Sequence, residues 1–445
     1  MPLDHTGQKP GRITVFAREV VAAATAGTPA AAELPFLVFL QGGPGFESPR
    51  VTEAGGWVKA ACEKFRVLLL DQRGTGKSTR VSAATLAALP SPGGCAEFLL
   101  HFRADAIVRD CEAIRAALGV QQWSLLGQSF GGFCSCTYLS FAPSALREVL
   151  ITGGLAPCIA QRCPEAVDAV YKALYPRVAT QTAKYYARFP GDVEVVARIV
   201  RHLAAAPGGG VDTPSGGRLT PRGLQLLGWA LGSAGGFEAV HYLLETAWEA
   251  DLAGAAAGGA AAAPGEQPAP ALSLAFLRGY EATLSFDTNP LYAIIHEACY
   301  ANGGATRWAA QRALDAGLAA QLDPVAAAAA GRLVPFTGEM VFPFMFDDIA
   351  SLRPLKAAAH ALAEHEWPPT LYDAAALARN TVPTAATAYF EDLYVEFALA
   401  TETAAAINGC RVWVTSEYMH SGVREDGARV LGTLLAMARG DEPLR

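Results

Sequence analysis

Four short apolar stretches in the first third of the chain each end in glycines or polar residues. They are LPFLVFLQGGPG (34–45), FRVLLLDQRGTG (65–76), WSLLGQSFGG (123–132) and REVLITGGLAP (147–157). Continuous apolar runs of this length are typical of parallel strands buried on both faces. Residues 104–119 have apolar side chains at helical spacing and end at a glycine. The alternation predicts a parallel, doubly wound sheet, whose ligands bind at the carboxyl ends of the strands.

The chain changes character after the fourth run. Its pattern is mostly helical there, and strand-like stretches return only near 381–395 and 409–422. We therefore expect a sheet core at 1–157, an inserted helical cap at 158–378 and the remainder of the core at 379–445.

Three stretches of the predicted cap stand out. Residues 289–303 and 306–322 have the apolar spacing of helices. Residues 251–271, DLAGAAAGGAAAAPGEQPAPA, are low in complexity, and we interpret them as a flexible surface loop.

Composition excludes several classes of protein. Of 445 residues, 51% are hydrophobic and 17% charged, which permits a large buried core. The net charge of −7 and the lack of a basic stripe argue against a nucleic-acid partner. We found no apolar run of about 18 residues, the length that a membrane span needs, and we expect no membrane partner.

The cysteines and the N-terminus bear on location and on metal binding. Nine cysteines are scattered along the chain, and no two have C-x-x-C spacing. This pattern argues against a disulfide framework and against a structural zinc site, and it favours a reducing compartment. The first residues lack the layout of a secretory signal. We expect a cytoplasmic protein, or an organellar one if a transit peptide has been removed.

The segment DQRGTGKST (71–79) resembles the end of a nucleotide-binding P-loop. The full motif, G-x-x-x-x-G-K-[ST], requires a glycine where this chain has Asp71. A carboxylate there would face the phosphates. We therefore interpret the segment as a strand-end loop, in which Arg73 holds a neighbouring carboxylate or carbonyl.

The motif G-x-S-x-G occurs at residues 127–131, between a predicted strand and a helix-like stretch. In this context it indicates a nucleophile elbow, a tight turn that presents a serine hydroxyl above the sheet. The turn also places the serine at a helix N-terminus, where the helix dipole favours developing negative charge. Ser129 is the predicted nucleophile.

A serine nucleophile needs two N–H donors for the oxyanion. The N–H of Phe130, directly after Ser129, is one candidate. Gly43, in the QGGPG segment after an early strand, is the second, although a plain Gly-Pro turn explains the same residues.

The base and the acid should follow in the chain order Ser, Asp or Glu, His. His420 follows the last predicted strand, and it is the one histidine beyond the predicted cap. Asp392 follows the preceding strand and is the preferred acid. Glu391 is the fallback, and Glu396 lies nearby.

The motifs FLQGGPGF, LLDQRGTGKST, GQSFGGF, YFEDLYV and EYMHSG together resemble the proline iminopeptidase (prolyl aminopeptidase) family of α/β-hydrolases, in its larger form. The resemblance extends from about residue 2 to the C-terminus. It implies an α/β-hydrolase fold, no metal or organic cofactor, and peptide substrates with an N-terminal proline. The oxyanion segment begins with Gln41 where the family usually has histidine.

The resemblance also implies acidic cap residues that bind the free amine of the substrate. Glu297, Glu339 and Glu245 are the candidates, and Glu339 has aromatic neighbours that suit a proline ring. For each of these glutamates, the ordinary alternative to a binding role is that it is a solvated or salt-bridged residue of a helix.

We therefore predict a serine aminopeptidase that uses Ser129, His420 and Asp392. Two alternatives stay open: a broader esterase, amidase or aminopeptidase of the same fold, and a ligand receptor built on a hydrolase scaffold.

Overall fold

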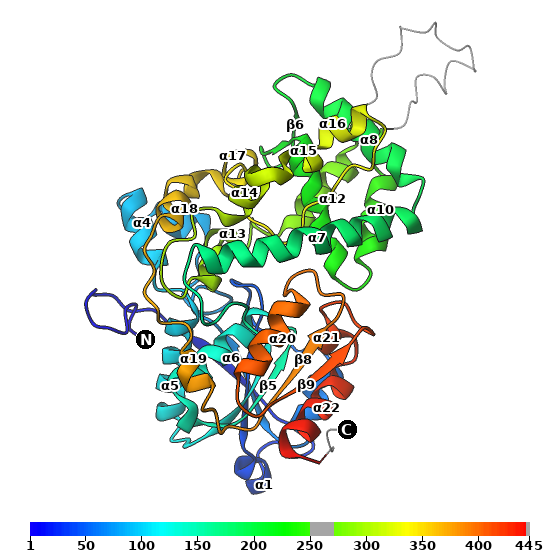
Figure 1. The fold of residues 1–445 in the computed structure, drawn as a ribbon. Helices are drawn as coiled ribbons and strands as arrows, with labels where there is room; N and C mark the ends of the chain where they lie inside the picture. Colours follow the sequence, from blue (N-terminus) through cyan, green and yellow to red (C-terminus); the bar gives the residue numbers. More distant parts are fainter. Residues whose placement is uncertain (250–270, 442–445) are drawn as a thin grey trace, which may run out of the picture.

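A seven-stranded sheet forms the centre of the molecule (Figure 1), in the order β1-β3-β2-β4-β5-β8-β9. The structure is a computed structural model that describes residues 1–249 and 271–441. The strands from β2 to β9 run parallel, and β1 pairs antiparallel with β3 at one edge. The strands are β1 (Phe16–Val20), β2 (Phe36–Leu40), β3 (Arg66–Asp71), β4 (Trp123–Gln128), β5 (Leu146–Thr152), β8 (Thr384–Tyr389) and β9 (Cys410–Thr415).

The predicted fold class is confirmed, because all six apolar or strand-like stretches form strands of this sheet. Every residue of β2, β4 and β8 is buried, as expected of strands covered by helices on both faces. Strand β1 was not predicted. It lies at the edge, its residues are only partly buried, and its pattern lacks a continuous apolar run.

Helices cover both faces of the sheet. Alternate residues of β2, such as Phe39 and Val38, belong to the apolar clusters on opposite faces. The helices on one face are α2 (Gly56–Cys62) and α22 (Gly427–Arg439), and those on the other include α5 (Ala104–Ala117), α6 (Phe130–Phe141) and α20 (Phe397–Ala406).

The chain between β5 and β8 forms a second layer beyond the carboxyl ends of the strands (Figure 1). This layer is mainly helical and also contains a small hairpin. Its longer helices are α7 (Glu165–Arg188), α8 (Asp192–Ala205), α10 (Gly236–Glu245), α12 (Leu274–Leu284) and α18 (Lys356–Ala363). Its shorter elements are β6 (Val211–Asp212), β7 (Arg218–Leu219), α9 (Pro221–Leu224), α13 (Pro290–Ile294), α14 (Ala309–Ala313), α15 (Ala319–Leu322), α16 (Pro324–Ala329) and α17 (Met345–Asp348).

Two elements cross the predicted division between core and cap. Helix α19 (Ala374–Leu377) lies beside α6 in the sheet layer, although it falls within 158–378. Helix α4 (Pro92–Leu99), from the N-terminal part, packs against α18 in the upper layer. The remaining short helices are α1 (Pro29–Glu33), α3 (Ala83–Ala87) and α21 (Gly422–Glu425). The predicted surface loop at 251–271 lies, except for its last residue, outside the described residues.

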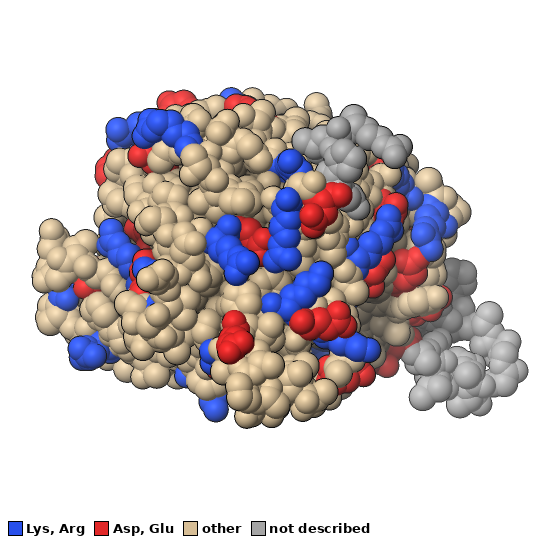
Figure 2. Space-filling model, turned by 90° about the horizontal axis from the view of Figure 1, so that it is seen from below, with Lys and Arg blue, Asp and Glu red and all other residues tan. Residues whose placement is uncertain are grey.

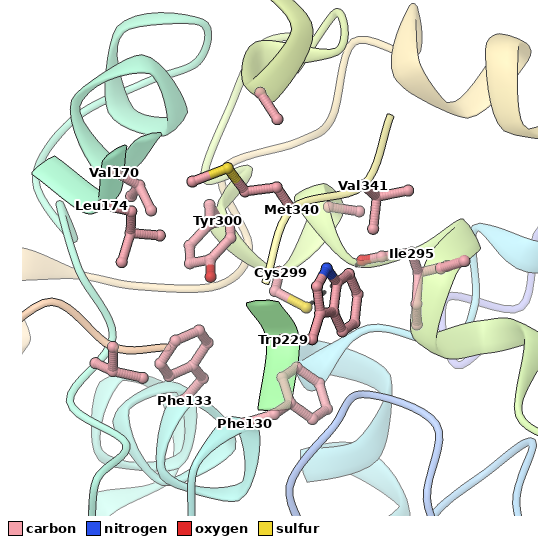
Figure 3. Close-up of a cluster of buried hydrophobic side chains, with 14 of the residues drawn as sticks. Phe130, Phe133, Val170, Leu174, Trp229, Ile295, Cys299, Tyr300, Met340 and Val341 are labelled. Carbon is pink, nitrogen blue, oxygen red and sulfur yellow. Dashed lines mark hydrogen bonds between the residues drawn. The ribbon is translucent and has the colours of Figure 1, made fainter. Parts of the chain in front are cut away.

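A continuous apolar cluster joins the two layers. Figure 3 shows Phe130 and Phe133 of α6 below, facing Val170 and Tyr300 of the upper layer. The rings of Phe133 and Tyr300 lie 5.7 Å apart, centroid to centroid. Because this contact is part of the main core, the upper layer is held on the sheet by buried apolar area.

The two predicted cap helices are interrupted. Residues 289–303 form α13 and a separate 3-10 turn at Glu297–Tyr300. Residues 306–322 form α14 and α15, joined by a π turn in which Gly317 has a φ of 145°. That backbone conformation is open to glycine and ends the regular helix, although the apolar spacing continues.

Charged residues of both signs are interspersed on the face opposite the upper layer (Figure 2). Among the helices of the described ranges, none is both long and apolar enough to cross a bilayer.

The loop after β3 is closed by its own polar side chains. Both carboxylate oxygens of Asp71 accept from the guanidinium of Arg50, at 2.8 and 2.6 Å, and the N–H of Lys77 donates to the same carboxylate. A Cβ on Gly76 would lie 2.3 Å from an Asp71 oxygen. The Asp71 carboxylate is therefore bound by Arg50 and by a backbone N–H of its own loop, and it leaves no room for a side chain at Gly76.

Arg73 is buried at the base of the same loop. Its guanidinium donates to both oxygens of Asp110, each at 2.7 Å, and to the carbonyl of His101. This is the carboxylate and carbonyl contact expected from the sequence, and it ties the loop to α5.

Candidate active site

A cavity of about 250 Å³ lies between the carboxyl ends of the strands and the upper layer. Residues of the sheet layer and of the helical layer both line it. They are Gln41, Gly42, Gly43, Phe46, Gln128, Ser129, Ser233, Tyr292, Glu339, Tyr394, His420, Ser421 and Arg424. The cavity thus brings together residues from seven separate parts of the chain, among them Ser129 and His420.

Ser129 occupies a sharp turn between β4 and α6. Its φ of 55° and ψ of −125° lie outside the regions that non-glycine residues favour. The backbone N–H of Ser129 donates to the carbonyl of Thr152 at 3.0 Å, so the turn is fixed to the end of β5. Strain of this kind persists only where the surrounding structure holds it, and it is common at functional sites.

The glycines around Ser129 allow the backbone to pack very closely. A Cβ on Gly131 would lie 1.9 Å from the carbonyl oxygen of Leu40, at the end of β2. A Cβ on Gly132 would lie 2.4 Å from the carbonyl oxygen of Gly154, after β5. A Cβ on Gly127 would meet the Gly131 carbonyl oxygen at 2.4 Å. The turn therefore requires glycine at each position for steric reasons.

His420 is hydrogen-bonded to Asp392. The distance from His420 Nδ1 to Asp392 Oδ2 is 2.7 Å, and both side chains are buried. The other oxygen of Asp392 accepts from the N–H groups of Tyr394 and Val395. When Nδ1–H donates to the carboxylate, Nε2 is left as a proton acceptor.

The other two acidic residues of this region are engaged elsewhere. Glu391 binds Lys184 at 2.6 Å and Gln181 at 2.8 Å. The carboxylate of Glu396 accepts from the N–H of Leu399 and caps α20. Neither residue lines the cavity.

The two predicted oxyanion donors come from segments next to Ser129: Phe130 follows it in the chain, and a Cβ on Gly42, the residue before Gly43, would lie 2.9 Å from Ser129 Cβ. Gly43 lines the cavity, and its φ of 121° is one that glycine adopts readily. Phe130 is the first residue of α6, and the first N–H groups of a helix have no partner within the helix. The Phe130 side chain packs against Phe133, so a role at the site would use its backbone.

Glu339 is the predicted cap glutamate that the structure places in the cavity. It is 9% exposed, and its Oε1 accepts a hydrogen bond from the hydroxyl of Tyr292. Burial raises the pKa of Glu339 to about 7, because a buried carboxylate loses hydration; the Tyr292 hydrogen bond and the nearby His420 oppose this shift.

The structure does not bring Glu297 or Glu245 into this cavity. The Glu297 carboxylate accepts from the N–H groups of Ala309 and Ala310, each at 3.1 Å, at the start of α14. Burial also raises the pKa of Glu297 to about 7. Glu245 is largely exposed at the end of α10, 3.4 Å from His241 Nε2. Glu297 thus has a capping position, and Glu245 lies on the surface.

Several lining residues were not predicted as site residues. Gln128 directly precedes Ser129, and Arg424 follows His420 by four positions. Their closeness in sequence to the predicted catalytic residues could therefore have indicated that they belong to the site. Tyr394 follows Asp392 closely, and its ring lies 4.8 Å from the His420 ring. Ser233 and Tyr292 come from the upper layer, and no local pattern marks them.

The comparisons with known proteins identify the family of the chain. Residues 35–194 match the family model described as alpha/beta hydrolase fold. The proline iminopeptidase of Aeromonas sobria is 45% identical over 99% of this chain and 95% of its own length. The chain belongs to the proline iminopeptidase family.

Relatives in the family differ in how much of the chain they match. Proline iminopeptidase aneH of Aspergillus aculeatus is 33% identical over 98% of this chain and 92% of its own length. The proline iminopeptidase of Neisseria gonorrhoeae is 30% identical over only 26% of this chain and 32% of its own length. The full-length similarity to the first two includes the helical layer.

The described residues contain no group of three or more His, Cys, Asp and Glu side chains placed to hold a metal ion.

A first prediction concerns the close packing at Gly131. Gly131→Ala should lower the free energy of unfolding by about 1–3 kcal/mol, because the new methyl group overlaps the Leu40 carbonyl. Gly432→Ala is the matched control, since Gly432 also lies in a helix but has no atom within 4 Å of a built Cβ. It should stabilise the protein by up to about 1 kcal/mol. Urea denaturation measures the free energy of unfolding of both variants. Equal changes in the two variants would contradict the steric explanation.

Proposed function

We propose that this protein releases N-terminal proline from peptides by serine catalysis. The observation that carries the proposal is the strained Ser129 turn, which borders the same cavity as the hydrogen-bonded His420–Asp392 pair. The membership of the proline iminopeptidase family supports the choice of substrate.

The reaction would have two halves. In the first, Ser129 Oγ attacks the carbonyl carbon of the N-terminal proline while His420 Nε2 takes the hydroxyl proton. His420 then gives this proton to the leaving amine, the peptide bond breaks, and a prolyl ester on Ser129 remains. In the second half, His420 Nε2 takes a proton from water while the water oxygen attacks the ester carbon; the bond to Ser129 Oγ then breaks, His420 returns the proton to Ser129 Oγ, and free proline leaves.

Asp392 would act on His420 alone. Its hydrogen bond to Nδ1 fixes the tautomer that has Nε2 free, and its negative charge stabilises the imidazolium that forms in each half-reaction. The Tyr394 and Val395 N–H groups hold the carboxylate in place for this contact.

The oxyanion would be held by the N–H groups of Gly43 and Phe130. Gly43 lines the same cavity as Ser129, Phe130 follows Ser129 directly, and the Gln72 side chain donates to the carbonyl of Gln41 at 3.0 Å, which fixes the loop before Gly43. Donors that need no rearrangement stabilise the developing charge most effectively.

Glu339 would bind the amine of the substrate. A carboxylate that borders the cavity attracts the secondary ammonium of an N-terminal proline, and the nearby rings of Phe46, Tyr292 and Tyr394 offer apolar walls to the pyrrolidine ring. The helical layer formed mainly by 158–378 would act as a cap that excludes longer N-terminal extensions. Glu297 and Glu245 are not among the residues that line the cavity, and their carboxylates contact other groups.

A reducing, cytoplasmic location is also proposed. All nine cysteines are free thiols, and eight of them are buried.

The nucleophile is tested with proline-arylamide. Ser129→Ala should lower kcat/KM by at least about a thousandfold, because members of a triad act as a unit. Turnover is followed by release of the aryl amine, and circular dichroism checks that the variant folds. Activity within tenfold of the wild type would overturn the proposal. If a short p-nitrophenyl ester proved the faster substrate, the broader esterase alternative would be favoured.

Two adjacent carboxylates test the assignment of the acid. Asp392→Asn should lower kcat by about 10³ to 10⁴, since an amide NH₂ facing Nδ1 favours the wrong tautomer of His420. Glu391→Gln should stay within about threefold of the wild type, because Glu391 pairs with Lys184 at the surface. Steady-state kinetics with proline-arylamide give kcat for both variants. A larger loss in the Glu391 variant would reverse the assignment.

The pKa of Glu339 predicts a specific pH dependence. Because burial raises it to about 7, the carboxyl group is neutral at lower pH and gains charge as the pH rises through 7. The ratio of kcat/KM for proline-arylamide to that for an uncharged ester should therefore rise between about pH 5.5 and 7.5, where the substrate amine is mostly protonated. Using a ratio cancels the titration of His420, which serves both substrates.

Glu339→Gln should remove this rise, and Glu297→Gln is the matched control. Glu297 is equally buried and has a pKa near 7 as well, but it lies outside the cavity. Its variant should keep the rise in the ratio. Loss of the rise in the Glu297 variant, with retention in the Glu339 variant, would transfer the amine-binding role to Glu297.

A further inference from the structure

The cavity has one acidic and one basic wall. Among the described residues that line it, Glu339 and Arg424 are the only Asp, Glu, Lys or Arg side chains. No ion pair joins them within the described parts of the chain. Glu339 is held by Tyr292 from the upper layer, whereas Arg424 contacts Gln128 in the sheet layer. The two charges therefore belong to different walls.

Arg424 has no carboxylate partner in residues 1–249 and 271–441. Its one side-chain hydrogen bond there is from Nη2 to Gln128 Oε1, at 3.3 Å. A guanidinium has five N–H donors in a fork that matches a carboxylate. Most of this donor capacity is unused by the protein. Arg424 lies in α21, four residues after His420; it is exposed, so solvent reaches its free donors, and it lines the same cavity as Ser129 and His420.

Gln128 adds a second unused donor. Its side chain is 1% exposed and lines the cavity, and its Nε2 has no hydrogen-bond partner in the structure. A buried amide N–H without an acceptor costs stability. Gln128 lines the same cavity as Ser129, so a ligand in this cavity can supply the acceptor that Nε2 lacks.

We propose that Arg424 and Gln128 form a subsite for the C-terminal carboxylate of a short substrate, so that the enzyme prefers proline dipeptides with a free carboxylate. This inference rests on the proposed function. With the ammonium at Glu339 and the scissile carbonyl at Ser129, the carboxylate of the leaving residue reaches the opposite wall. A charge-assisted contact to a guanidinium is stronger than a neutral hydrogen bond.

The size of the cavity supports a short substrate. Its volume of about 250 Å³ is below the usual range for sites that hold drug-sized ligands, roughly 300–1,000 Å³. A zwitterionic dipeptide matches both the volume and the two separated charges. A longer peptide has a neutral amide where the dipeptide has its carboxylate, and it leaves the guanidinium without a partner.

The test compares Pro-Ala as the free acid with Pro-Ala amide, which differ only in the terminal charge. Release of proline gives kcat/KM for each. The wild type should prefer the acid by about tenfold or more, which corresponds to about 1.4 kcal/mol. Arg424→Gln should bring the acid-to-amide ratio close to one, and Arg424→Lys should retain part of the preference because it keeps the charge.

Arg429→Gln is the matched control. Arg429 lies on the next helix and pairs with Glu417 at the surface, so its variant should keep the wild-type ratio. A wild-type ratio near one, or a ratio that Arg424→Gln leaves unchanged, would overturn the subsite. Wild-type turnover of proline-arylamide separates the two proposals: without it the proposed function fails, whereas turnover without discrimination between acid and amide removes only the carboxylate subsite.

Discussion

Glycines that pack tightly against the backbone of neighbouring strands hold the turn at Ser129. Gly131 packs on the Leu40 carbonyl at the end of β2, and Gly132 packs on Gly154 after β5. The turn of β4 is thus clamped between the ends of its two neighbouring strands. Because these contacts involve backbone on both sides, neither partner can move to relieve an added side chain. The position of the Ser129 hydroxyl depends on this clamp.

The helical layer contributes Tyr292 and Glu339 to the cavity, and it buries the Glu339 carboxylate, which changes the pKa of that group. The apolar cluster around Phe133 and Tyr300 fixes this layer to α6, and Tyr292 and Glu339 reach the cavity from it. Burial there makes the protonation of Glu339 respond to pH near 7, far above the usual range of a carboxyl group. An exposed glutamate such as Glu245 attracts an ammonium much more weakly, because water screens it.

Patterns along the chain predicted the strands better than the helices of the upper layer. The parallel strands are buried on both faces, so β2, β4 and β5 read as continuous apolar runs. Strand β1 lies at the edge and lacks that signal. The stretch 306–322 keeps helical spacing across Gly317, yet the backbone leaves the helix there. Apolar periodicity indicates which side chains are buried, but it does not indicate at which residue the helical hydrogen bonds end.

The sequence by itself determined the sheet, the turn at Ser129 and the location of His420 after the last strand, because each depends on local sterics or on short apolar runs. Only the tertiary structure decided which carboxylates face these groups. Asp392 meets His420 while Glu391 turns to Lys184, and Glu339 borders the cavity while Glu297 caps α14. Neighbouring carboxylates are chemically equivalent in a sequence, and the packing of segments far apart in the chain gives each one its partner.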